Sequence, residues 1–255
     1  MPKVGILIPT MNRSDFLIRQ LEYYSLINSN HPVYIGDASN IKHRTKIETA
    51  IIRLSSHIDI KYFYWPKCDP HLTLKKLGEK NKESYCAFTG DDDFFVPDSL
   101  TKCAEFLDNN PLYRTAQGKG VLFSLDRPGA FGSLTSFDSY WKRQEAEEDS
   151  ASSRMLNFAG NYWVPQFSVH RSNEFIKDSL NYGKKMDKSF GELLHSFTFI
   201  VKGKSKFIDC LYLVRQGHNN QYSLPDTFDW ISNLEWQPSC ELFMKYLTKE
   251  IVDID

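Results

Sequence analysis

The sequence has no long hydrophobic run. None of its segments approaches the roughly 18 uninterrupted apolar residues that a membrane-spanning helix needs. Met1-Pro2-Lys3 leads into a short strand-like stretch instead of the apolar core of a signal peptide. We therefore expect no transmembrane segment and a location in the cytoplasm.

Cysteine is scarce, and its spacing carries no pairing pattern. The five cysteines are odd in number, widely separated and form no C-x-x-C pair. This distribution argues against a disulfide framework or a zinc knuckle and favours reduced, mostly buried thiols. Cys68 and His71 lie three residues apart, but one such pair without a second is weak evidence for a metal site.

Neither sign of charge is in excess. The 31 Lys and Arg residues face 32 Asp and Glu residues, for a net charge of −1, which provides no basic surface for nucleic acid. The phosphate-binding P-loop, the G-x-S-x-G nucleophile elbow and the dinucleotide-binding G-x-G-x-x-G motif are also missing. Because 41% of the residues are hydrophobic and 25% are charged, we expect a folded globular chain without a nucleic-acid partner.

The first 110 residues alternate short apolar runs with amphipathic stretches. Hydrophobic patterning predicts strands at residues 4–9, 33–35, 58–64 and 85–89. Helices are predicted between them, the first capped by Asn12 or Ser14 and the others at about 42–55 and 72–82. This order predicts an α/β fold with an open, mostly parallel twisted sheet flanked by helices, whose ligands bind beyond the carboxyl ends of the strands.

The second half is less regular. We expect strands at residues 121–123, 164–170 and 206–214, and helices at 98–107, capped by Asp98, at 186–201 and at 239–247. Residues 126–162 are rich in Gly, Ser and charge, and an irregular connection of that length is usually a lid or binding loop. We find no repeat or linker, so residues 1–255 are expected to form a single domain.

Three consecutive aspartates, Asp91, Asp92 and Asp93, follow the fourth predicted strand. Carboxylates a few ångströms apart resist joint ionisation, so a positive group is expected among them. A site with only a few carboxylate ligands suits a Mg²⁺ or Mn²⁺ ion that also binds substrate phosphates. An EF-hand is excluded, because the glycine and the bidentate glutamate of its loop are missing. The alternative is a solvated acidic turn that binds nothing.

Several segments together resemble the family-2-like glycosyltransferases of the GT-A fold. VGILIPTMNR at residues 4–13 resembles the opening strand and P-T-x-N-R turn of that family, and IGDAS at 35–39 resembles its D-x-S strand end. Residues 85–93, followed by PDSL at 97–100, resemble the block that carries the metal motif. Each piece is weak by itself, but their joint order and spacing make the resemblance fairly specific.

The resemblance covers residues 3–107 well and 186–220 loosely. It implies a GT-A-like fold with a Rossmann-like nucleotide-sugar-binding half at about 1–110 and an acceptor-binding catalytic half at about 111–220. A C-terminal helical extension at about 221–255 completes the expected layout.

The resemblance implies a metal-dependent transfer of sugar from a nucleoside-diphosphate sugar, generally a UDP-sugar, with inversion and with Mn²⁺ or Mg²⁺ as cofactor. The acceptor would be a glycan, a lipid-linked molecule or a protein, and a lipid-linked acceptor would place the protein at the membrane periphery. The implied nucleotide-binding residues are Pro9, Thr10, Asn12, Arg13, Asp37, Ser39, Lys75 and Asp91. The implied metal ligands are Asp92, with Asp91 and Asp93 beside it, and His218 on a later loop.

The chain departs from the family pattern at two of these places. Gly90 stands where many members have the first acid of the metal motif, which leaves Asp92 as the best ligand and Asp91 as a partner for ribose or a bridging water. Lys75 lies near the position of the family's usual Arg-Asn pair, where it either neutralises a phosphate or faces solvent.

The expected general base is a carboxylate at the start of a late helix, about eleven residues before a glycine. Glu192 precedes Gly203 by eleven residues and is our first choice, and Asp187, five residues earlier, is the second. On a helix the two point about 140° apart, so they do not share one pocket. Either could instead be a carboxylate that stabilises the helix dipole.

Two other functions remain open at this point. A nucleotidylyltransferase would share the α/β layout but would be expected to have a glycine-rich basic loop after the first strand, and residues 9–13 contain no glycine. A catalytically silent GT-A-like binding or scaffold domain is the other alternative. Candidate aromatic contacts for an acceptor are Phe137, Tyr140, Trp141 and Trp163, and nothing in the sequence sets the oligomeric state.

Overall fold

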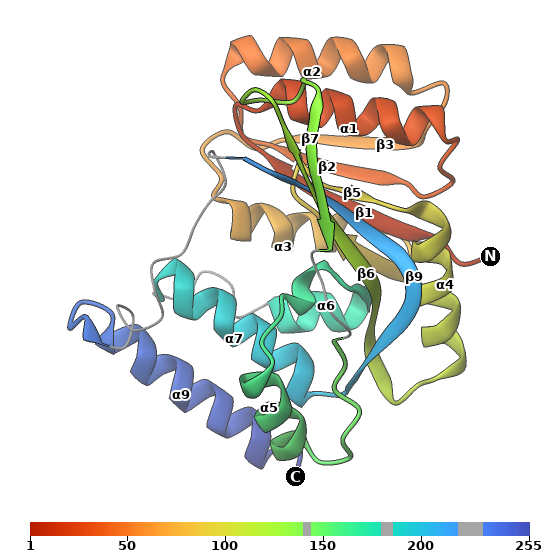
Figure 1. Ribbon diagram of the computed structural model, residues 1–255. Helices are drawn as coiled ribbons and strands as arrows, with labels where there is room; N and C mark the ends of the chain where they lie inside the picture. Colours follow the sequence, from red (N-terminus) through yellow and green to blue (C-terminus); the bar gives the residue numbers. More distant parts are fainter. Residues whose placement is uncertain (140–143, 180–185, 219–231) are drawn as a thin grey trace.

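The computed structural model describes residues 1–139, 144–179, 186–218 and 232–255 (Figure 1). Its centre is a twisted sheet with helices on both faces. The strands are β1 (Val4–Thr10), β2 (Val33–Asp37), β3 (Ile60–Tyr64), β4 (Tyr85–Phe88), β5 (Phe94–Phe95), β6 (Tyr113–Leu125), β7 (Leu134–Ser139), β8 (Val169–Arg171) and β9 (Lys204–Gly217). The helices are α1 (Ser14–Leu26), α2 (Ile41–Leu54), α3 (Pro70–Lys80), α4 (Pro97–Asn109), α5 (Ala151–Gly160), α6 (Ser172–Ser179), α7 (Lys188–Val201) and α9 (Gln237–Val252).

The first half of the sheet is parallel. Strand β1 pairs with β2 on one side and with β4 on the other, and β2 pairs with β3, all in parallel register. The carboxyl ends of these strands meet at one edge, where Thr10 lies opposite Asp37. The predicted α/β fold is therefore confirmed, with the strand and helix order that the hydrophobic pattern indicated.

The second half of the sheet is mixed, which the sequence pattern did not indicate. Strand β8 runs antiparallel to both β4 and β6, whereas β9 runs parallel to β6 and antiparallel to the short β5. The order across the sheet is β3-β2-β1-β4-β8-β6-β9-β5, with β7 attached to β6, among the residues that the structure describes. The pairing of β5 with β9 brings the end of β9 next to the segment that follows β4.

The two faces of the sheet are covered by different helices. Leu17, Ile47 and Leu100, from α1, α2 and α4, pack on one face together with Ile6 and Ile8 of β1. The opposite face buries Leu7 against side chains of α3, α6 and α7. Successive residues of β1 thus point to opposite faces, and both are buried, as expected for a parallel strand between two helical layers.

The predicted helix caps were wrong in two places. Arg13, and neither Asn12 nor Ser14, is the N-cap residue of α1, and its side chain makes no cap hydrogen bond. Val96 precedes α4, so Asp98 lies in the first turn, where a carboxylate still interacts favourably with the helix dipole.

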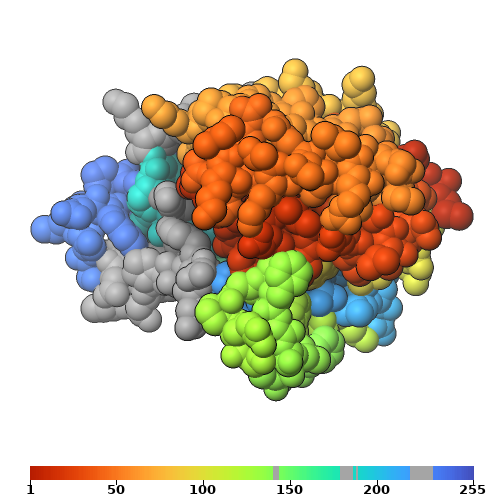
Figure 2. Space-filling model, turned by 90° about the horizontal axis from the view of Figure 1, so that it is seen from above, coloured from red at the N-terminus to blue at the C-terminus, as the bar shows by residue number. Residues whose placement is uncertain are grey.

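The segment at 126–162 is not a structureless loop, because it contains β7 and α5. Strand β7 folds back on β6 as an exposed hairpin, which protrudes beside α1 in Figure 2 (light green). Only the end of the strand predicted at 164–170 is a strand, because a 3-10 helix, η1 (Pro165–Phe167), precedes the short β8. The C-terminal helix is longer than predicted, and its Phe243 and Leu247 pack against α7.

No helix in the described parts of the chain combines the length and the hydrophobicity that crossing a bilayer requires.

Substituting Tyr24 tests how α1 supports β5. The buried Tyr24 hydroxyl accepts a hydrogen bond from the backbone N–H of Phe95 at 3.1 Å, whereas the half-buried Tyr23 hydroxyl only donates to the Phe95 carbonyl at 3.3 Å. Tyr24→Phe leaves a buried N–H without its partner, so we expect the free energy of unfolding to fall by about 1–3 kcal/mol in urea titrations. Tyr23→Phe, the matched control, should cost less than about 1 kcal/mol; equal losses would contradict this assignment.

Candidate functional site

A cleft of about 750 Å³ opens at the carboxyl ends of the parallel strands. It lies where ligands bind in open α/β sheets. Its lining joins the end of β1, the aspartate turn after β4 and the end of β9, three segments that are far apart in the sequence. The residues that line it are Pro9, Thr10, Met11, Arg13, Ala38, Cys68, Pro70, Thr73, Phe88, Gly90, Asp91, Asp92, Asp93, Leu122, Phe167 and Arg215.

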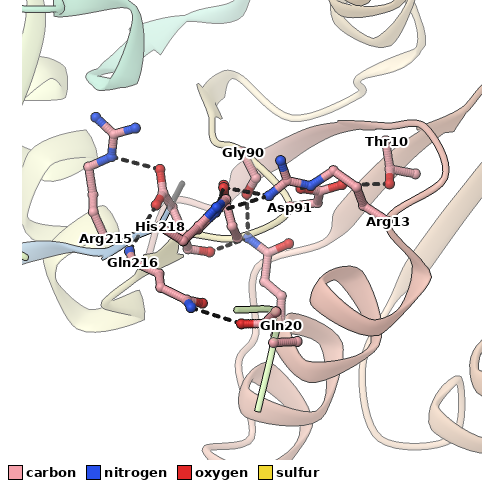
Figure 3. A network of polar contacts seen from close by, with 12 residues as sticks. Thr10, Arg13, Gln20, Gly90, Asp91, Arg215, Gln216 and His218 are labelled. Carbon is pink, nitrogen blue, oxygen red and sulfur yellow. Dashed lines mark hydrogen bonds and ion pairs between the residues drawn. The ribbon is translucent and has the colours of Figure 1, made fainter. Parts of the chain in front are cut away.

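One guanidinium connects two of the three aspartates. Arg13 places Nε 2.9 Å from Asp91 Oδ1 and Nη2 2.5 Å from Asp92 Oδ2 (Figure 3). Thr10 donates its hydroxyl to the other oxygen of Asp91 at 2.7 Å. The P-T-x-N-R turn and the aspartate turn are therefore in direct contact.

His218 meets the same oxygen of Asp92 that Arg13 contacts. Its Nε2 lies 2.8 Å from Asp92 Oδ2. The ring of Phe16 contacts both partners of Asp92, because the Arg13 guanidinium lies 4.5 Å from its centroid and the His218 ring stacks on it at 5.1 Å. The structure thus brings together Asp92 and His218, which are 126 residues apart.

Asp93 has a separate partner. Arg215 Nε lies 2.8 Å from Asp93 Oδ2, and the backbone N–H of Gln216 donates to Oδ1 at 3.3 Å. The Arg215 guanidinium also lies 5.0 Å from the ring centroid of Phe167, which lines the cleft. Asp93 therefore holds Arg215 at the wall of the cleft.

Two residues of α1 that the sequence analysis did not select support the aspartate turn from behind. Gln20 donates its side-chain amide to the carbonyls of Gly90 and Asp93 (Figure 3), and Arg19 donates to the carbonyl of Asp92 at 3.2 Å. Both contacts are to backbone atoms, which leave no motif in the sequence. The one indication in the sequence is the spacing of Gln20, a polar residue that follows Phe16 by four positions and so lies on the apolar face of the predicted helix.

Glycine at position 90 leaves room for Asp92. A Cβ atom built on Gly90 would lie 2.5 Å from Asp92 Oδ1, so any other side chain would displace that carboxylate. The departure from the family pattern at Gly90 is therefore coupled to the position of Asp92.

Burial and ion pairing act against each other on these carboxylates. Burial raises the pKa of Asp91 to about 7 in spite of Arg13, and it raises the pKa of Asp93 to about 7 in spite of Arg215. Burial also opposes ionisation of Asp92, but Arg13 and His218 together outweigh it and lower the pKa of Asp92. Asp92 is thus the carboxylate whose surroundings most favour the charged form.

The D-x-S segment lies beside the cleft and is fully occupied by internal contacts. Buried Asp37 accepts hydrogen bonds from the Ser39 N–H and the Tyr62 hydroxyl, both at 2.7 Å. Ser39 in turn accepts from the N–H of Asn12 at 2.8 Å, and Asn12 adopts a left-handed φ of 60°. These hydrogen bonds fix the shapes of the turns that follow β1 and β2. Ala38, between Asp37 and Ser39 in the sequence, lines the cleft.

Seven predicted site residues are not among those that line the cleft: Asn12, Asp37, Ser39, Lys75, Asp187, Glu192 and His218. Lys75 lies on α3, two residues after Thr73, which lines the cleft. Asp187 caps α7, its side chain accepting from the N–H groups of Ser189 and Phe190.

Glu192 lies one turn further along α7, where the Tyr162 hydroxyl donates to its Oε1 at 3.3 Å. Burial raises the pKa of Glu192, and the Tyr162 hydrogen bond and the charge of Arg215 partly offset this rise. Glu192 is therefore close enough to Arg215, a residue of the cleft wall, for their charges to interact.

The candidate acceptor aromatics have different surroundings. Phe137 is 59% exposed on β7, whereas Trp163 is only 3% exposed and packs edge-on against Phe158. Trp163 is thus a core residue, which corrects its assignment as a sugar contact. Tyr140 and Trp141 lie outside the described residues.

The donor set fits a metal ion that is shared with a ligand. Within the described parts of the chain, no three His, Cys, Asp or Glu side chains are grouped so as to hold a metal ion by themselves. Asp92 and His218 nevertheless present an oxygen and a nitrogen only 2.8 Å apart. Mg²⁺ and similar ions are commonly held by one or two carboxylates while substrate phosphates and water complete the shell.

The strand order, with its parallel half and the cleft at the strand ends, is that of a GT-A glycosyltransferase fold. No protein-family model and no curated protein matches the chain in sequence.

Solved structures of S. aureus TarS are similar to it in fold. TarS 1-349 matches with a TM-score of 0.65 and 14% identity over 99% of this chain and 66% of that one. Its complex with UDP-GlcNAc matches with a TM-score of 0.63 and 14% identity, over 99% and 67% of the two chains. Its complex with UDP matches with a TM-score of 0.60 and 15% identity, over 99% and 66%. The chain therefore spans about two thirds of the TarS 1-349 structures.

Breaking the Asp93–Arg215 pair tests its contribution to stability. Arg215→Met leaves the buried Asp93 carboxylate without its cation, so we expect a loss of about 3 kcal/mol in the free energy of unfolding at pH 8. Without Arg215 the pKa of Asp93 rises further, so the folded variant keeps a proton there that the unfolded chain has released. The stability of Arg215→Met relative to wild type therefore falls as pH rises. The loss in the free energy of unfolding should be smaller at pH 5 than at pH 8.

The control for this pair is an exposed one. Arg127→Met breaks the contact between Arg127 and Asp126, in which the arginine side chain is 67% exposed, and should cost less than about 1 kcal/mol. Adding Asp93→Asn to Arg215→Met should recover part of the loss at pH 8. A loss for Arg215→Met that is the same at both pH values would contradict the assignment.

Proposed function

We propose that this protein is a family-2-like glycosyltransferase that moves a sugar from a nucleoside-diphosphate sugar, a UDP-sugar, to a hydroxyl of a glycan, lipid-linked or protein acceptor. The observation that carries the proposal is the joining of Arg13, the three aspartates, Arg215 and His218 around one cleft of a GT-A fold. The similarity to TarS structures that hold UDP-GlcNAc and UDP supports this donor class.

The diphosphate of the donor would bind between the cations of the cleft. Arg13 and Arg215 each present a planar guanidinium whose N–H groups match phosphate oxygens. Their carboxylate partners Asp91, Asp92 and Asp93 hold these groups in place before a ligand arrives. The nucleoside would lie toward Pro9 and Ala38, at the ends of β1 and β2.

A divalent ion, Mn²⁺ or Mg²⁺, would be held by Asp92 and His218, with Asp91 and Asp93 adjacent. When bound it would supply positive charge that stabilises the departing diphosphate.

Glu192 is our proposed general base. Its raised pKa makes it a stronger base than an exposed glutamate, and a base is most effective when its pKa approaches the working pH. It would accept the proton of the acceptor hydroxyl as that oxygen attacks the anomeric carbon from the face opposite the diphosphate, which inverts the configuration. Asp187 is less suited, because its carboxylate already accepts two N–H groups of α7.

Nucleotide binding is the first test. In calorimetric titrations with UDP, GDP and CDP, each with and without Mn²⁺, we expect UDP to bind most tightly and only with the metal. Asp92→Asn should weaken metal-dependent binding at least about tenfold, because it removes the carboxylate charge from the site. Asp59→Asn, which removes an equal charge from an exposed ion pair with Lys61, should leave binding unchanged.

The outcomes separate the candidate functions. If no nucleotide binds under any condition, the transferase proposal fails. If UDP binds with metal but a panel of UDP-sugars is neither hydrolysed nor transferred, the silent binding domain is the better description.

The pH dependence of turnover tests Glu192. Because the Tyr162 hydrogen bond lowers the pKa of Glu192, Tyr162→Phe should raise that pKa and move the acidic limb of kcat against pH to higher pH. Well above the limb, kcat should stay within about twofold of wild type, whereas Glu192→Gln should lose roughly 100-fold or more at every pH. A limb that stays in place in Tyr162→Phe would exclude Glu192 as the group that sets it.

A further inference from the structure

The carboxylate that would bind a metal ion is already paired with an arginine and a histidine of the protein. Asp92 Oδ2 lies 2.5 Å from Arg13 Nη2 and 2.8 Å from His218 Nε2, so both donors contact one oxygen (Figure 3). The same guanidinium reaches Asp91 through Nε. Arg13 therefore stands between the two carboxylates nearest to the turn of β1.

A divalent cation at Asp92 would compete directly with this guanidinium. Two positive groups within a few ångströms of one carboxylate oxygen repel each other strongly where water is scarce, and Asp92 is only 8% exposed. An ion that takes Asp92 Oδ2 must therefore separate Arg13 from it. By the same reasoning, a diphosphate that arrives alone finds Arg13 occupied by Asp91 and Asp92.

Arg13 is held in a way that allows its side chain to leave. The side chain is 28% exposed, and among the described residues no acceptor is aligned with its Nε–H bond although Asp91 Oδ1 is near. Its backbone carbonyl accepts from the N–H groups of Phe16 and Leu17, so the main chain stays fixed when the side chain moves. The Phe16 face, 4.5 Å away, offers the guanidinium a contact that does not depend on the aspartates.

We propose that Arg13 is an internal counter-ion of the metal site, which a divalent cation and a diphosphate displace together. The cation takes Asp92 from Arg13, and the released guanidinium gains the phosphate as its new anionic partner. Binding of metal and binding of nucleotide then strengthen each other, since each removes a cost of binding the other. The inference rests on the proposed function for the metal ion at Asp92 and for the identity of the nucleotide.

Binding of Mn²⁺ alone tests the inference without any turnover. Free Mn²⁺ is measured by electron paramagnetic resonance in titrations of the full chain, first without nucleotide and then with saturating UDP. For wild type we expect weak binding of Mn²⁺ that UDP tightens at least about tenfold. For Arg13→Gln we expect Mn²⁺ alone to bind roughly tenfold more tightly than to wild type. UDP should still tighten that binding, because phosphate oxygens would complete the metal shell, but by a smaller factor than in wild type.

Three further variants make the comparison specific. Arg53→Gln removes the same charge from a surface pair with Glu22 and should bind Mn²⁺ like wild type. Asp92→Asn should lose the tightened binding when added to Arg13→Gln. Arg13→Lys keeps the charge but cannot span both carboxylates, so this variant should bind Mn²⁺ alone more tightly than wild type does. If Arg13→Gln does not fold, Arg13→Lys tests the role of Arg13 in its place.

Mn²⁺ binding to a folded Arg13→Gln, or failing that Arg13→Lys, that is no tighter than binding to wild type would overturn the inference. A failure of the proposed function is distinguishable, because it would appear as an absence of UDP binding in every variant. The comparison of Mn²⁺ alone would still decide the role of Arg13 in that case.

Discussion

Three consecutive buried carboxylates are the constraint on which the rest of this structure depends. Asp91, Asp92 and Asp93 are each at most 8% exposed, and buried charges without partners destabilise a fold by several kcal/mol each. Their partners come from opposite ends of the chain: Arg13 from the start of α1, and Arg215 and His218 from the end of β9. The aspartate turn is therefore stable only where these segments meet. The strand order of the sheet thus determines which residues make up the site.

Much of the parallel half of the sheet follows from sequence pattern. Short β-branched runs alternating with amphipathic stretches indicated the parallel strands β1 to β4, and parallel strands place their carboxyl ends at one edge. That rule alone brings the turn after β1 next to the aspartates, and the resemblance added His218. The contacts of Thr10 and Arg13 with Asp91 are thus of the kind that sequence reasoning can anticipate.

The remainder depends on contacts that leave no local pattern. Gln20 and Arg19 hold the aspartate turn through hydrogen bonds to backbone carbonyls. Every residue has such a carbonyl, so these contacts cannot be read from the sequence. The mixed half of the sheet depends on the three-residue β8 and on the bulged pairing of β6 with β9, neither of which has a clean alternation. Segment 126–162 has the composition of a loop, yet pairing with β6 makes part of it the strand β7, because tertiary contacts override weak propensity.

The position of β9 late in the chain has a consequence for biosynthesis. Asp92 and His218 are separated by 126 residues, which a ribosome adds in roughly 6–25 s at typical elongation rates. During this interval the parallel half can fold around an acidic turn that has Arg13 as a partner but lacks Arg215 and His218. The nascent domain would thus pass through a stage with a surplus of negative charge in its unfinished cleft, and the cleft would be complete only once β9 has joined the sheet.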